Sequence, residues 1–370
     1  MLSKEVILKV AAKAKELALH SWEYGTTAEA LLELENPALS VFSKHPFPED
    51  KVPSARIEDV ESLQYAKNHI IAGSSRTLCK DNNSVADPAS LGVFAILIGQ
   101  SHPECLDAAH RQMEYLYEAP SYGNSKAISH RKDVEEVWAD FIYMVPPFLA
   151  YYALAVDKSY YMKQAVEQCV AYNEILATKS EGLDRGLWHH IAGPKNVDPG
   201  YWCTSNGWVA AGLAQILATL MSWSPTREWH HEAGVLRSMI RYLIDGVIAT
   251  DEHRDEAKLL PNYLYAKDKE PWFGDVAGTA LLSSVVYHMM VLDSEHFHGL
   301  CHRGGVFYTA WADNKSRAVS ECVDEASGIA KPAVNPLKHS QRQPLMTGSP
   351  EAQSFVVLMW AAMRDYMAQG

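Results

Sequence analysis

The sequence predicts an all-α protein in which six helical hairpins close into a ring. Apolar residues recur at i, i+3, i+4 and i+7 in almost every periodic segment, and signals for strands are scarce. Clusters of small and polar residues open six of the helical segments and lie about 50 to 75 residues apart. That spacing is the length of a helix pair with its loops. Because one hairpin cannot bury its apolar face alone, a closed ring of hairpins is favoured.

About twelve helices are expected along the chain. Nine ranges have a clear apolar stripe: 6–18, 60–71, 105–117, 134–155, 160–176, 208–223, 228–248, 276–292 and 352–367. Three weaker ranges are 27–34, 88–98 and 316–327. Length alone suggests two or three domains, but 370 residues over six hairpins gives about 62 residues each. We therefore expect residues 1–370 to form a single domain.

The six clusters indicate where the inner helices converge. They occupy the ranges 24–27, 87–90, 138–140, 205–208, 275–279 and 349–352. Bulky side chains would clash at such a point, whereas polar groups there can face a central cavity. Helix capping by Ser, Thr, Asn and Asp explains some of the clusters, but it does not explain their even spacing.

Composition and charge exclude several classes of protein. The chain is 48% hydrophobic and 21% charged, which is ordinary for a globular protein and excludes a disordered or coiled-coil chain. A net charge of −12 argues against a nucleic-acid partner, because phosphate contacts need clustered Lys and Arg. Since no apolar run reaches the ~18 residues of a membrane helix and no signal peptide is recognisable, we expect no membrane contact and a cytoplasmic location.

Familiar cofactor and metal motifs are absent from the sequence. It contains no GxxxxGK[ST], GxGxxG, HExxH or GxSxG, and its six cysteines form no CxxC pair. The tightest group of possible ligands matches no standard zinc spacing and consists of His296, His298, Cys301 and His302. We therefore expect neither a cofactor nor a metal ion.

Asp140 is the strongest candidate for a catalytic group. It stands in an otherwise apolar and aromatic segment, residues 137–144. Burying a carboxylate is costly unless it is paired, hydrogen-bonded or protonated. Desolvation by neighbours such as Trp138 would raise the pKa of Asp140 and suit it to donate a proton near neutral pH. The alternative is that Asp140 caps a helix or serves as a structural hydrogen-bond hub.

Asp87 and a group of aromatic residues add a second candidate feature. Asp87 opens a helical segment and precedes Pro88, so capping is its natural alternative role. Residues 187–190, which include His190, and residues 201–208 add flat aromatic faces and hydrogen-bond donors. Sugars present both C–H faces and hydroxyls, so aromatic rings beside carboxylates and amides favour a carbohydrate pocket. The alternative is an ordinary aromatic core.

Five motifs in this order resemble the six-hairpin glycosidases of glycoside hydrolase families 88 and 105. These are the unsaturated glucuronyl and unsaturated rhamnogalacturonyl hydrolases. The matching ranges are 22–25, 87–92, 138–144, 186–190 and 202–208. The resemblance implies an (α/α)6 barrel that uses no metal ion. It also implies hydration of the C4=C5 enol ether that lyases leave on uronic acids, with a small oligosaccharide as the binding partner. The oligomeric state stays open.

The same resemblance implies roles for individual residues. Asp140 would protonate C4 and then, as a carboxylate, deprotonate the water that adds at C5. Asp87 would bind sugar hydroxyls or tune Asp140 through like-charge coupling. The remaining positions are implied to bind substrate: Tyr24, Thr27, His130, Trp138, Met144, His190, Trp202, Thr204, Asn206 and Trp208.

Thr204 is the one marked departure from the family pattern. Rhamnogalacturonyl hydrolases commonly carry Arg at this position, and Arg binds carboxylates bidentately whereas Thr cannot. Either His130, Arg131, Lys132 or His190 meets the uronate carboxylate instead, or the substrate differs. The alternatives are the same barrel acting on a saturated glucuronide or another small molecule, and a non-catalytic sugar-binding protein.

Overall fold

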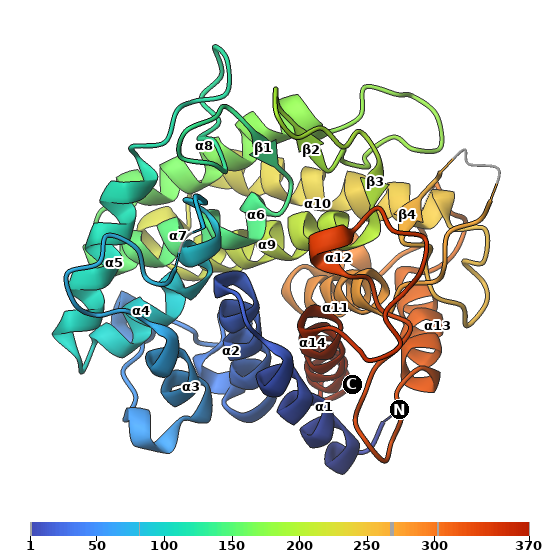
Figure 1. The fold of residues 1–370 in the computed structure, drawn as a ribbon, viewed down its shortest axis with the longest axis horizontal. Coiled ribbons are helices and arrows are strands. Elements are labelled where there is room, and N and C mark those ends of the chain that lie inside the picture. The colour runs from blue at the N-terminus through green and yellow to red at the C-terminus, as the bar shows by residue number, and fades with distance from the viewer. Residues whose placement is uncertain (1, 81, 267–269, 302, 370) are drawn as a thin grey trace.

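The computed structural model describes residues 2–80, 82–266, 270–301 and 303–369. Its helices form two layers around one axis (Figure 1). The inner layer consists of α2 (Ser21–Glu35), the 3-10 helix η4 (Asp87–Leu91) with α4 (Gly92–Gly99), α6 (Phe141–Met144) with α7 (Pro146–Ala155), α9 (Cys203–Ser222), α11 (Val276–Leu292) and α14 (Pro350–Met367). The outer layer consists of α1 (Lys4–Leu17), α3 (Glu61–His69), α5 (Pro103–Leu116), α8 (Ser159–Leu176), α10 (His230–Thr250) and α13 (Tyr308–Glu321). The short helix α12 (Ser294–Phe297) lies between α11 and α13 in the chain.

The inner elements form a closed ring. Contacts run in chain order from α2 to η4, α6, α9, α11 and α14, and α14 packs back onto α2. The first helix, α1, packs on α14, so the beginning of the chain covers its end, and both termini lie on the same side in Figure 1. This arrangement confirms the predicted (α/α)6 barrel.

The two layers differ in how their helices are buried, as their sequences require. Every residue from Cys203 to Leu220 of α9 and from Val276 to Met290 of α11 is buried. By contrast, α1 buries only one stripe, which includes Val6 and Val10. A helix that is apolar all round must be covered on all sides, whereas an amphipathic helix can face water.

Two glycines show that the inner helices converge where the small-residue clusters predicted it. A Cβ on Gly25 of α2 would lie 2.5 Å from Ser90 Oγ in η4. A Cβ on Gly278 of α11 would lie 2.4 Å from Cys203 Sγ at the start of α9. Both distances are shorter than van der Waals contact, so a larger residue at either position would push neighbouring inner helices apart.

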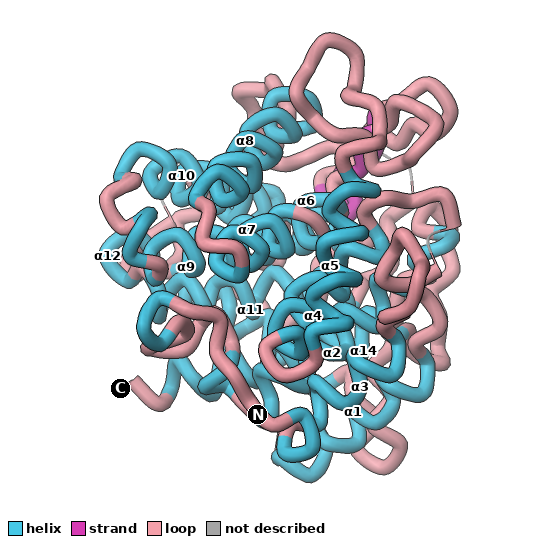
Figure 2. The backbone as a smooth tube through the Cα atoms, turned by 90° about the vertical axis from the view of Figure 1, so that its left-hand side faces the viewer, coloured by secondary structure: helices cyan, strands magenta, loops and turns pink. Residues whose placement is uncertain are grey.

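Short strands and long loops gather on one side of the helices (Figure 2). β1 (Val137–Trp138) pairs antiparallel with β2 (Ile191–Ala192), and β3 (Tyr201–Trp202) pairs antiparallel with β4 (Tyr263–Leu264). The β1–β2 pair corrects the helix predicted over 134–155, because residues 137–138 are extended and the helix begins only at Phe141. Asp140 therefore stands directly before a helix.

Another predicted helix is displaced along the chain. The helix expected over 316–327 runs from Tyr308 to Glu321, because its buried stripe includes Tyr308 and Trp311 in the first turns. Among the described helices, none combines the length and the apolar character required to cross a membrane.

Candidate active site

The first turns of the inner helices and the loops next to them surround a cavity of 670 Å³. Eight of the residues singled out from the sequence line it: Asp87, His130, Trp138, Asp140, Met144, His190, Trp202 and Trp208. Other lining residues include His20, Trp22, Asn82, Arg131, Lys195, Asn196, Asp198, Leu337, His339 and Glu351. Residues far apart in the sequence thus meet at one end of the ring.

Tyr24 and Thr27 on α2 do not line this cavity. The Tyr24 ring stacks on His69, with 3.7 Å between the centroids and 11° between the planes. The Thr27 hydroxyl is buried and lies 3.1 Å from Ser354 Oγ of α14. As the structure stands, both side chains join helices to one another.

Thr204 and Asn206 are also buried away from the cavity. Thr204 Oγ1 donates to Asp275 Oδ2 over 3.1 Å, which ties α9 to the N-cap of α11. Asn206 accepts from the Trp188 N–H at 2.9 Å and donates to the carbonyls of Trp188 and Trp202, each at 3.0 Å. These bonds give Thr204 and Asn206 structural partners, and their contact with substrate stays a prediction.

Asp140 lies directly before α6 and pairs with a histidine. The side chain makes no capping hydrogen bond to α6, which removes the capping alternative within the described residues. Its Oδ2 lies 3.2 Å from His190 Nε2, and only 12% of the side chain is exposed. The pairing of Asp140 with His190 depends on the antiparallel pair of β1 and β2, because Asp140 lies two residues after β1 and His190 directly precedes β2.

The pKa of Asp140 shifts in the direction opposite to the one predicted. Burial raises it, but the positive charge of the adjacent His190 ring lowers it by more, so the pKa falls below its ordinary value. Burial lowers the pKa of His190, but Asp140 and Asp198 raise it more, to about 9. The direction of the shift is decided by His190, which is distant in the chain, rather than by sequence neighbours such as Trp138. At neutral pH the pair is a carboxylate and an imidazolium.

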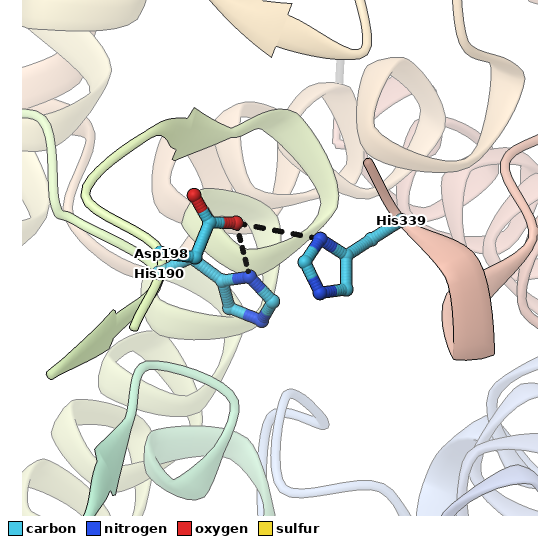
Figure 3. A group of neighbouring side chains, drawn as sticks. All are labelled: His190, Asp198 and His339. Atoms are coloured by element: carbon cyan, nitrogen blue, oxygen red, sulfur yellow. Dashed lines mark hydrogen bonds and ion pairs between the residues drawn. The ribbon is translucent and has the colours of Figure 1, made fainter. Parts of the chain in front are cut away.

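Behind His190 lies a second carboxylate that sequence reasoning missed. His190 Nδ1 is 2.9 Å from Asp198 Oδ2, which also accepts from the Tyr263 hydroxyl over 2.5 Å. His339 Nδ1 lies 3.3 Å from the same oxygen, as Figure 3 shows. Burial raises the pKa of Asp198, but the bond and charge of His190 lower it to about 2. Asp198 therefore holds the charge on His190.

His190, Asp198 and His339 also have the spacing of a possible cation site, since their donor atoms all lie within 4.8 Å of one another. In the structure, Asp198 Oδ2 already lies 2.9 Å from His190 Nδ1 and 3.3 Å from His339 Nδ1. Burial and the nearby His190 lower the pKa of His339 to about 4, so its ring is neutral. The three side chains therefore form a polar cluster as they stand, and the absence of a metal stays a prediction.

The metal-ligand group considered from the sequence does not form one cluster among the described residues. His296 Nδ1 pairs with Asp293 at 2.8 Å, and Cys301 Sγ lies 3.3 Å from Asp245 Oδ1. His302 lies outside the described residues.

Asp87 belongs to a second carboxylate–histidine pair in the cavity. Its Oδ1 lies 3.0 Å from His130 Nε2, and the His130 ring stacks on Trp138 with 5.1 Å between centroids. The Ser84 hydroxyl accepts from the N–H of Asp87, so Asp87 does not act as the cap of η4. Arg131 also contacts Trp138, with its guanidinium 4.6 Å from the ring centroid.

Comparisons with known proteins give a family match over half of the chain. A family model described as Glycosyl Hydrolase Family 88 matches residues 58–245. Its match spans Asp87, His130, Asp140, His190 and Asp198. No curated protein sequence matches the chain significantly.

Solved structures of similar fold cover nearly the whole chain. A possible member of the GH105 family from Salmonella enterica serovar Paratyphi A has a TM-score of 0.71 and 14% identity, covering 99% of this chain and 96% of its own. A family 88 glycosyl hydrolase from Bacteroides vulgatus has a TM-score of 0.66 and 13% identity, with 98% of both chains covered. An unsaturated glucuronyl hydrolase from Bacillus sp. GL1 has a TM-score of 0.61 and 10% identity, covering 98% of this chain and 94% of its own. At such identities these likenesses show a shared fold.

Proposed function

The chain belongs to glycosyl hydrolase family 88, and from this premise we propose that it hydrolyses unsaturated uronyl oligosaccharides by hydrating the C4=C5 enol ether. The observation that carries the proposal is the buried Asp140, which lines the cavity and pairs with His190 at 3.2 Å without capping its helix. A similar fold occurs in an unsaturated glucuronyl hydrolase and in another described as specific for heparin.

The Asp140–His190 pair supplies the proton that the first step needs. In the free protein that proton resides on His190, because the pKa of Asp140 is lowered and that of His190 is raised to about 9. An anionic substrate beside Asp140 disfavours its charged form, so the proton passes from His190 Nε2 to the carboxylate. Asp140 then gives the proton to C4 of the sugar.

Asp140 acts as the base in the second step. Protonation at C4 leaves a cation shared by C5 and the ring oxygen, and a water adds at C5 while Asp140 takes its proton. The sum of the two steps is the addition of one water. The hemiketal formed at C5 opens, and the remaining sugar is expelled. Asp87, held by His130 at 3.0 Å, binds sugar hydroxyls from the neighbouring wall.

The test uses the unsaturated disaccharides that a polysaccharide lyase produces. The protein is expected to remove their enol-ether ultraviolet absorbance, and in heavy water deuterium is expected at C4 of the product. Asp140→Asn is expected to abolish both effects while remaining folded. The matched control is Asp107→Asn, an exposed carboxylate on the outer helix α5. Turnover retained by Asp140→Asn would remove Asp140 from this role.

A second candidate, cleavage of a saturated glucuronide or another small molecule, is favoured by one observation. Thr204 stands at the family's Arg position and is bonded to Asp275, so that position presents no cation to the cavity. Activity on saturated glycosides, with none on unsaturated disaccharides, would reverse the order of the two candidates. A non-catalytic sugar-binding protein would bind these sugars in calorimetry without any turnover.

A further inference from the structure

The sixth small-residue cluster, residues 349–352, contains a buried acid that the proposed mechanism does not use. Ser349 caps α14 by accepting a hydrogen bond from the Ala352 N–H at 3.2 Å, so Glu351 is not needed as a cap. Glu351 is nevertheless 99% buried and lines the same cavity as Asp140. Glu351 is therefore a buried acid in the first turn of an inner helix that lines the cavity and does not cap its helix.

Glu351 and Asp140 approach the cavity from opposite walls. Around the ring of six inner elements, α14 and α6 are separated by three steps in either direction. Trp22 Nε1 on α2 donates to Glu351 Oε1 over 2.8 Å, which fixes the carboxyl group in place. Its Oε2 has no hydrogen-bond partner among the described residues. One oxygen is thus anchored, and the other is buried without a partner.

The surroundings of Glu351 favour its neutral form. Burial raises the pKa of its carboxyl group well above the ordinary value, and the charge of Glu23 raises it again. The bond from Trp22 lowers the pKa by less, and Asp140 adds a further raising effect. A neutral carboxyl group carries one O–H donor that a carboxylate lacks.

The cavity has few free cations to receive an anionic sugar. Among the described lining residues, the Lys and Arg side chains are Arg131, which is partly exposed and stacked over Trp138, and Lys195, which is exposed. His130 and His190 already face the carboxylates of the site. Among the described residues, the buried part of the cavity wall therefore offers a neutral acid but no Lys or Arg.

We propose that Glu351 is a substrate-binding residue whose neutral carboxyl group donates a hydrogen bond to the carboxylate of the uronyl unit. Two carboxyl groups that share one proton form a stable pair where two carboxylates would repel each other. This arrangement lets an acidic protein bind an anionic sugar without an Arg at position 204. It rests on the proposed function for the identity of the sugar, but it concerns binding rather than turnover.

The test compares the affinity of an unsaturated uronyl disaccharide with that of its methyl ester, which has no carboxylate. Calorimetry in an Asp140→Asn background prevents consumption of the ligand, so the result does not depend on whether the enzyme turns it over. The acid is expected to bind at least about tenfold more tightly than the ester. Glu351→Gln keeps a neutral donor and should keep this preference. Glu351→Leu should weaken binding of the acid about tenfold or more and leave the ester unchanged.

Two controls make the outcome decisive. Lys195→Ala, which removes the exposed cation at the cavity, should keep the preference for the acid. Raising the pH should weaken binding of the acid when Glu351 is present and not when Gln replaces it. This pH comparison tests the proposal even if the Leu variant does not fold. The proposal is overturned if the Leu variant retains the preference, if Lys195→Ala abolishes it, or if Gln behaves like Leu.

Discussion

The cavity holds two carboxylate–histidine pairs that differ in what lies behind the histidine. Asp140 and His190 are 3.2 Å apart, and Asp87 and His130 are 3.0 Å apart. The second nitrogen of His190 meets Asp198 at 2.9 Å, whereas that of His130 has no hydrogen-bond partner among the described residues. Two pairs with nearly equal geometry are therefore set up for different tasks.

The difference indicates that the second carboxylate keeps a proton on His190, which is the proton that the proposed mechanism uses. Because His190 lies between two carboxylates, its pKa is raised to about 9, and it keeps its proton up to about that pH. It can lend that proton to Asp140 and recover it afterwards. His130 instead lies flat against Trp138, which suits an orienting role. The following predictions test this contrast, from the largest expected effect to the smallest.

Replacing the two aspartates should separate catalysis from binding. Asp140→Asn is expected to lower kcat by about 10² to 10⁴-fold, because no group remains to move the proton. Asp87→Asn is expected to raise KM about tenfold, the cost of one or two hydrogen bonds to sugar hydroxyls, with a smaller effect on kcat. Steady-state kinetics on unsaturated disaccharides measures both. Equal losses of kcat in the two variants would contradict the division of roles.

Replacing the histidine should again lower kcat more in the Asp140–His190 pair than in the Asp87–His130 pair, with smaller effects than replacing the aspartates. His190→Gln removes the proton store behind Asp140 and is expected to lower kcat about 100-fold. His130→Gln keeps a hydrogen-bond donor for Asp87 and is expected to change kcat by less than about tenfold. Circular dichroism checks that both variants fold. The comparison fails if His130→Gln is the more damaged enzyme.

Asp198→Asn should shift the pH profile. The wild-type kcat/KM is expected to fall as the pH rises through about 9, where His190 loses its proton. Without the Asp198 charge, the pKa of His190 drops, and this alkaline limb should move down by about one pH unit or more. Asp107→Asn is the control and should leave the limb in place. An unmoved limb in Asp198→Asn would separate Asp198 from the proton store.

The stability contributed by Asp198 and His190 should be greatest in a defined pH window. The raised pKa of His190 stabilises the fold fully below its ordinary value of 6.5, and this contribution is lost as the pH rises through about 9. The lowered pKa of Asp198 stabilises the fold above its ordinary value of 3.8, and this contribution is lost as the pH falls through about 2. Asp198→Asn should therefore be destabilised by about 1 to 2 kcal/mol near pH 5 to 6 and by less above pH 9. Urea unfolding at several pH values measures the difference, and a gap that widens above pH 9 would contradict it.

The helical ring could be predicted because its signals are local and repeated. The apolar faces of the inner helices and the small residues beside Gly25 and Gly278 follow from how tightly those helices must pack. The start of α6 could not be placed, since it depends on the pairing of β1 with β2, which lies some 50 residues away. A segment that is apolar enough to form a helix can become extended when another segment pairs with it as a strand.

Asp140 was identified from the sequence because a lone acid among apolar residues has few explanations. Its charge state could not be predicted in this way, since it is decided by His190 and, through it, by Asp198. Tyr263 and His339 come from still more distant segments and carry no local signal. The position of Glu351 in a helix-opening cluster was visible, but the absence of a hydrogen-bond partner for its Oε2 among the described residues was not.

The sequence by itself determined the class of fold, the number of hairpins and the candidate acid Asp140, because periodicity and burial act through neighbouring residues. Only the tertiary structure decided which residues face the cavity, which of its carboxyl groups are charged and which neutral, and that Thr204 turns toward Asp275. A pKa depends on charges and burial within a few ångströms, and closing the ring is what brings those groups together.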